Sequence, residues 1–161
     1  MSRARTIADF GDGIVDADLP AGSVLQVVSA TTQTPVTTSS NTFIDTGLTA
    51  NITPSSASSK ILIFVAQNGC HKNNLSSANM LDIQLIRGAT NLGQFAGALA
   101  QTSSGEDNNV STGFCFVDSP STTSSVTYKT MFNSRNNTSS VSVQYAGVST
   151  SSIVLMEIAD D

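Results

Sequence analysis

The stretch that most restricts the fold is a short apolar run at residues 60–67, with the sequence KILIFVAQ. It is rich in β-branched residues, and Pro54 with a serine-rich segment precedes it, while Asn68 and Gly69 follow it. A run this short, bounded by residues typical of turns, predicts a strand buried on both faces rather than a buried helix. Residues 152–159, SIVLMEIA, predict a second strand of the same kind. We expect the other strands to pair around these two.

Most of the other predicted strands alternate apolar and polar residues, the pattern of a strand with one buried face. Residues 80–87 show it clearly, residues 88–91 predict a tight hairpin turn, and Gly47 predicts a turn or bulge. The predicted strands cover residues 23–29, 42–46, 48–53, 60–67, 80–87, 92–100, 112–118, 125–132, 140–145 and 152–159. About ten short strands separated by turn residues predict an all-β fold, an antiparallel β-sandwich.

Composition excludes several functional classes. Charged residues make up only 12% of the chain, and the formal net charge is −5. The chain has no run of Lys and Arg interleaved with aromatics, so we expect it to bind neither nucleic acid nor an anionic membrane surface. No apolar stretch approaches the roughly 20 residues of a membrane span, so we expect no membrane insertion.

Residues 1–20 differ from the remainder, and we treat them as a separate arm. They contain too few apolar residues to fold alone, although residues 2–10 could form one or two helical turns. We expect the arm to become ordered only against a partner chain or the domain surface, and to serve as an anchor. The side chains predicted to make this contact are Arg3, Arg5, Ile7, Phe10, Ile14 and Val15. The β-sandwich domain then spans residues 21–161.

Neither a metal site nor a catalytic cysteine is expected around the one histidine, His71. Its neighbour Cys70 would point to the opposite face of a strand, and only Cys115 remains as a further cysteine. Two cysteines and one histidine fall short of a structural zinc set. A disulfide between the two cysteines is possible, but buried free thiols are the favoured interpretation because cysteine is among the most buried residue types.

The carboxylates form no recognisable catalytic pair or calcium loop. The acidic cluster at residues 9–18 lacks the spaced oxygen ligands of such a loop, and residues 106–107 lie in a predicted loop. Glu157 falls inside an apolar strand, so it either points outward or pairs with a cation. The candidate cations are Lys60, Arg87 and Lys129. We therefore expect no enzymatic activity and no cofactor.

Several segments resemble a module common in structural proteins of tailed bacteriophages, especially marine and cyanobacterial phages. The main one is residues 42–63, TFIDTGLTANITPSSASSKILI. Residues 20–28, 85–88 and 152–159 match the start, middle and end of that module. Residues 2–9 resemble the short segment that often precedes it in tail-fibre chains.

The order of strands also resembles the trimeric jelly roll of the tumour-necrosis-factor and complement type. This resemblance implies a homotrimer that displays loops at one end. Aromatic residues are enriched at interfaces, so some of this chain's aromatics are candidates for the threefold contact; alternatively, all of them pack within the monomer. The candidates are Phe95, Phe114, Tyr128 and Tyr145.

The resemblance implies a virion structural protein, made in the host cytoplasm and attached to the particle by its arm. The first expectation is a tail-fibre tip whose loops at residues 70–79, 102–111 and 133–139 contact a host-surface glycan or protein. The alternative is a capsid decoration protein, a cement or head fibre. A carbohydrate-active enzyme or lectin on the same fold would need convergent carboxylates or aromatics, which the sequence does not place.

Overall fold

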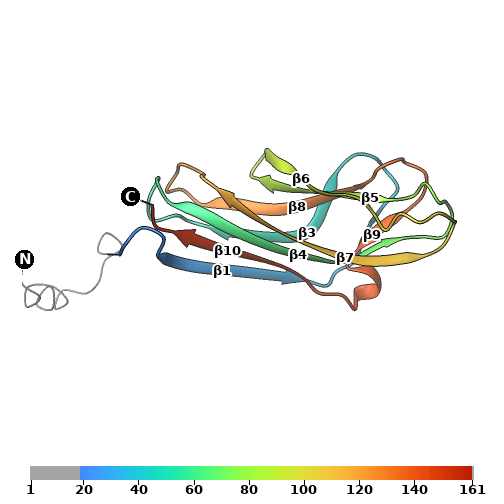
Figure 1. The fold of residues 1–161 in the computed structure, drawn as a ribbon, viewed down its shortest axis with the longest axis horizontal. Helices are drawn as coiled ribbons and strands as arrows, with labels where there is room; N and C mark the ends of the chain where they lie inside the picture. Colours follow the sequence, from blue (N-terminus) through green and yellow to red (C-terminus); the bar gives the residue numbers. More distant parts are fainter. Residues whose placement is uncertain (1–18, 161) are drawn as a thin grey trace, which may run out of the picture.

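A computed structural model describes residues 19–160, which form ten strands and one short helical turn. The elements are β1 (Val24–Thr32), β2 (Val36–Thr38), β3 (Ile44–Ile52), β4 (Lys60–Lys72), β5 (Leu81–Arg87), β6 (Thr90–Leu99), β7 (Asn108–Asp118), β8 (Val126–Ser134), β9 (Val141–Val143), the 3-10 turn η3 (Tyr145–Gly147) and β10 (Ser151–Ile158). The strands lie roughly along the long axis of the molecule (Figure 1).

Two antiparallel sheets make up the fold. In the first, β10 pairs with both β1 and β4, and β4 also pairs with β7 and with β9, which carries β2. In the second, the order is β3-β8-β5-β6. The prediction of an all-β antiparallel sandwich with about ten strands is confirmed.

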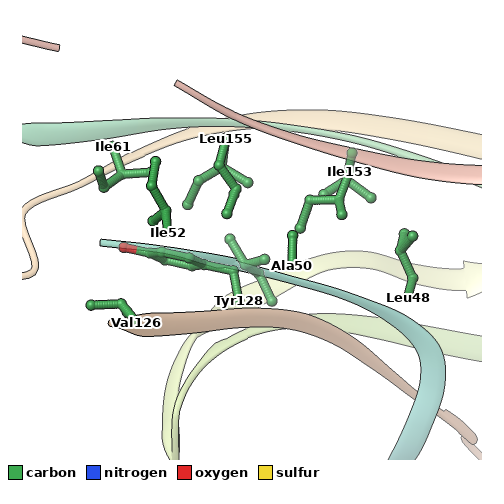
Figure 2. Close-up of a cluster of buried hydrophobic side chains, with 11 residues drawn as sticks. Leu48, Ala50, Ile52, Ile61, Val126, Tyr128, Ile153 and Leu155 are labelled. Atoms are coloured by element: carbon green, nitrogen blue, oxygen red, sulfur yellow. The ribbon is translucent and has the colours of Figure 1, made fainter. Parts of the chain in front are cut away.

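The main core lies between the two sheets. Figure 2 shows Ile61, Ile153 and Leu155 of the first sheet facing Ile52 and Tyr128 of the second. Each of these five side chains is at most 2% exposed. A second apolar cluster lies further along the sandwich and is formed by Cys70, Leu81, Ile83, Ala96, Ala100, Phe132, Val141 and Val143.

The two central strands are buried on one face only, so the prediction of burial on both faces is wrong. In β4, Ile61, Ile63 and Val65 point into the core, whereas Phe64 between them is 42% exposed. In β10 every second residue is fully buried and the intervening ones are only half-buried. Both strands therefore present apolar side chains on the outer face of the first sheet.

Several strand boundaries also differ from the prediction. β4 continues to Lys72 through a bulge between Gln67 and Cys70, so the loop expected at residues 70–79 begins only after Lys72. β7 starts at Asn108 rather than at residue 112, and the short β2 lies between the strands predicted at residues 23–29 and 42–46. The two strands predicted around Gly47 form a single strand, β3, whose pairing shifts register there. Gly47 has a positive φ of 81°, so the predicted bulge is confirmed.

The sandwich has two distinct ends. At one end, which we call the arm pole, residues 19–23 lie beside residues 159–160, because the Gly22 amide donates to the Ala159 carbonyl and the Ala159 amide donates to Ser23. The loop at residues 53–59 belongs to the same end. At the other end, the loop pole, the chain connects β4 to β5, β6 to β7 and β8 to β9. Figure 1 shows this separation, with the start of β1 and the end of β10 at one end of the sandwich and β9 at the other.

Candidate functional surfaces

The loop pole consists of residues 73–80, 100–107 and 135–140, and hydrogen bonds join the first of these loops directly to the third. Asn73 donates from Nδ2 to Ser140 Oγ at 2.8 Å and accepts from Ser139 Oγ at 2.7 Å. Asn79 Nδ2 donates to the Ser140 carbonyl at 2.7 Å, and Asn136 Nδ2 donates to Ala78 at 2.9 Å. The structure thus brings together, at one end, most of the three segments that the sequence predicted as contact loops.

Lys72, the last residue of β4, links the first two of these loops through hydrogen bonds. Its side chain is fully buried, and Nζ donates to the carbonyls of Ser76 at 3.0 Å and Ser104 at 3.3 Å. Backbone carbonyls are acceptable partners for a buried ammonium group because they satisfy its donors. The loops rest on this anchor and expose mainly amide and hydroxyl groups. The exposed residues are Asn74, Leu75, Ser77, Gln101, Ser103, Ser104, Gly105, Glu106, Asp107, Arg135, Asn136, Asn137 and Thr138.

His71 takes part in a stacked contact at the edge of the loop pole. Its ring lies 3.7 Å from the Tyr145 ring with an interplanar angle of 12°, and its Nε2 lies 3.5 Å from Asp107 Oδ1. Burial lowers the pKa of His71, and the opposing effect of Asp107 is smaller. Gly69 allows this arrangement, since a Cβ there would lie 2.5 Å from the Tyr145 amide nitrogen. The stack therefore fixes η3 against β4.

Both cysteines are free thiols, which confirms the favoured interpretation for pairing. Cys70 is buried, and burial raises the pKa of its thiol to about 12. Cys115 is exposed on the outer face of β7, so the expectation that both thiols are buried is wrong for this residue. Among residues 19–160, no group of three or more His, Cys, Asp and Glu side chains lies close enough to hold a metal ion.

Glu157 is neither outward-facing nor paired with a cation, so both alternatives from the sequence are wrong. Its side chain is fully buried near the arm pole. One carboxylate oxygen accepts from the Ser55 amide at 2.7 Å and the Ser55 hydroxyl at 2.8 Å, and the other accepts from Gln26 Nε2. Burial alone would raise the pKa of Glu157, but the hydrogen bonds from Gln26 and Ser55 outweigh burial and lower it.

The lowered pKa predicts a specific pH dependence for Glu157. The ionised form stabilises the fold above the pKa of the unfolded carboxyl, about 4.3, and this stabilisation is lost as the pH falls through the lower folded pKa. We expect Glu157→Gln to be clearly less stable than wild type at pH 7, with the difference shrinking below pH 4. Urea unfolding of both proteins at several pH values measures it; a difference that stays constant on acidification would contradict the assignment.

Most of the aromatic side chains predicted at a trimer interface make their contacts within the monomer. Tyr128 is fully buried in the core, so its predicted place at an interface is wrong. Phe95 stacks on Phe114 with ring centroids 4.5 Å apart and meets Phe116 edge-on at 5.3 Å, so these rings cover one another between β6 and β7. Tyr145 is 39% exposed beside His71. For Phe95 and Phe114 the alternative of packing within the monomer accounts for these contacts.

The predicted anchor residues lie outside the described residues. These are Arg3, Arg5, Ile7, Phe10, Ile14 and Val15, together with the acidic cluster at residues 9–18. Their role therefore stays a prediction. Within residues 19–160, no helix is both long and apolar enough to cross a membrane.

Fold and surfaces together define an antiparallel β-sandwich with a cross-connected loop surface at one end. No protein-family model matches the chain, and no curated protein matches it. Among solved structures, the fold is similar to the crystal structure of the infectious bursal disease virus VP2 subviral particle, with 15% sequence identity and a TM-score of 0.39. The alignment covers 85% of this chain but only 39% of the VP2 chain. A similarity this weak says nothing about the function of the present chain.

Proposed function

We propose that this chain is a non-enzymatic structural protein of a bacteriophage virion, and that it acts as a homotrimeric host-recognition tip of a tail fibre. In this proposal residues 1–20 attach it to other virion proteins, and the loop pole contacts a host-surface glycan or protein. The observation that carries the proposal is the opposite placement of the two ends. The chain leaves the arm at one pole, and the three connected loops lie at the other.

The composition of the loop pole suits contact with a hydroxyl-rich or amide-rich partner. Its exposed side chains are mainly Asn, Ser and Thr, which both donate and accept hydrogen bonds. The loops are held by Lys72 and by hydrogen bonds to one another, so little ordering is needed on binding. Preorganised loops of this kind lose less conformational entropy when they bind a partner.

Substitutions at the two poles of the full-length chain are expected to separate attachment from recognition. Phe10→Asp combined with Ile14→Asp should abolish incorporation into particles, because a buried apolar contact would then have to bury charge. Leu75→Asp at the loop pole should leave incorporation unchanged and reduce adsorption of particles to host cells. Quantitative immunoblotting of purified particles measures the first effect, and an adsorption assay measures the second.

Normal incorporation of the Phe10/Ile14 variant would contradict the anchor, and normal adsorption of the Leu75 variant would count against recognition by this loop. The copy number in wild-type particles separates the tail from the alternative, a capsid decoration protein, which we expect in far more copies. Cleavage of a host glycan by the purified protein would contradict the non-enzymatic assignment.

A further inference from the structure

The outer face of the first sheet is apolar across four strands. The strand register aligns two neighbouring rows of outward side chains from β1, β10, β4 and β7. The first row is Val27, Met156, Leu62 and Val117, and the second is Ser29, Val154, Phe64 and Cys115. We call these eight residues the apolar sheet face. Val27, Phe64 and Val117 are 56%, 42% and 53% exposed, which is high for side chains of this size.

The apolar sheet face carries no charge. Its eight side chains are all uncharged, and the nearest cation along β4 is Lys60, which lies at the rim opposite Ile158 and pairs with Asp160 at 3.0 Å. Glu157 and Asp118, the acidic residues of β10 and β7, are buried or nearly so. A partner recognised through opposite charge would find no complementary group on this surface.

The strands beneath this face have the sequence of strands covered on both sides. A half-solvated sheet normally alternates apolar and polar residues, whereas β4 carries Leu62 and Phe64 outward and β10 carries Val154 and Met156 outward. The whole outer face of these four strands, about eight residues long on each strand, spans roughly 500 Å² on each copy at the usual strand spacing and rise, and the two rows of the apolar sheet face take up its central half. Packed against an equal area on a neighbouring copy, this outer face approaches the roughly 1,000 Å² expected of a specific interface, with the apolar sheet face at its centre.

We propose that further copies of this chain cover the apolar sheet face, and that this face is the interface of the homotrimer. The inference rests on the proposed self-association and assigns it to a surface other than the aromatics Phe95, Phe114 and Tyr128. Identical acidic chains, each with a net charge of −5, repel one another over most of their surface. At the apolar sheet face they can meet without burying a charge.

Two substitutions in the face and one matched control test this assignment in the full-length protein. Val27→Asp and Val117→Asp place a carboxylate on the face at edge strands, where the side chains are more than half exposed and the monomer can tolerate the change. Val148→Asp makes the same change at a residue that is 79% exposed outside the face. By light scattering we expect both face variants to fall from three times 16.7 kDa to 16.7 kDa, and Val148→Asp to keep the wild-type mass.

Labelling of Cys115 with a maleimide gives an independent readout in the wild-type protein. We expect the thiol to react slowly in the assembled protein and rapidly in the Val27→Asp monomer, with Cys115→Ser as the blank. Rapid labelling of the wild-type oligomer, or face variants that keep the wild-type mass, would overturn the assignment while leaving self-association intact. A monomeric wild type would overturn both; if its Cys115 were protected, residues 1–18 of the same chain would be the cover.

Discussion

Replacing Asp118 by alanine is expected to lower the free energy of unfolding by about 3 kcal/mol, because it breaks a largely buried charged contact. The Asp118 carboxylate is 8% exposed and accepts from Arg87 Nη1 at 2.8 Å and from the Tyr128 hydroxyl at 2.6 Å. Asp118 belongs to the first sheet, whereas Arg87 and Tyr128 belong to the second. The contact therefore ties the two sheets together near the arm pole.

Tyr128 is the residue most affected by the removal of the Asp118 carboxylate. Its side chain is fully buried, and burial, followed by the hydrogen bond to Asp118, raises the pKa of its hydroxyl. Without Asp118 the buried hydroxyl has lost its acceptor, and Arg87 has lost its counter-charge. A buried donor without a partner costs about 1–3 kcal/mol on its own.

A matched control is available at the surface. Asp45 pairs with Lys129 at 2.7 Å, but its side chain is 56% exposed, so Asp45→Ala is expected to cost less than about 1 kcal/mol. Urea unfolding at equal protein concentration compares the two variants. If Asp118→Ala lost no more stability than Asp45→Ala, the contact between the sheets would contribute less to the free energy of unfolding than we expect.

Leu155→Ala is expected to have a similarly large effect, about 3 kcal/mol, because it leaves a cavity in the centre of the core. Leu155 is fully buried and packs between the sheets together with Ile61 and Tyr128, as Figure 2 shows. Leu75→Ala removes the same atoms from a side chain that is 76% exposed, and it should change stability by no more than about 0.5 kcal/mol. Thermal or urea unfolding measures both; equal effects would contradict the position of the core.

Much of the fold could be predicted from the sequence because period-two alternation survives in most strands. Residues 80–87 and 125–132 alternate, and both became strands of the second sheet. The bulge at Gly47 and a hairpin turn at Gly88 also appeared as predicted, since a positive φ favours glycine at both places, although the turn covers residues 88–89 and not 88–91. The end of β4 was predicted wrongly, because Asn68 and Gly69 look like a turn in the sequence but form a bulge after which the strand continues.

The surfaces were harder to predict because they depend on contacts between residues far apart in the chain. The neutral donors around Glu157 come from Gln26 and Ser55, more than 100 positions away, so the sequence pointed instead to an outward-facing side chain or to a cation. The apolar run at residues 60–67 correctly indicated apolar side chains on both faces of a strand. It could not indicate that only one face is covered among the described residues, because that depends on how the two sheets pack.

The measurement that tests the central claim most directly is the mass of the full-length wild-type protein in solution, by light scattering over a range of concentrations. The account predicts a value near three times 16.7 kDa, with the apolar sheet face closed inside the assembly. A mass of 16.7 kDa at every concentration would contradict it, because the outer face of the first sheet would then stay uncovered by other copies.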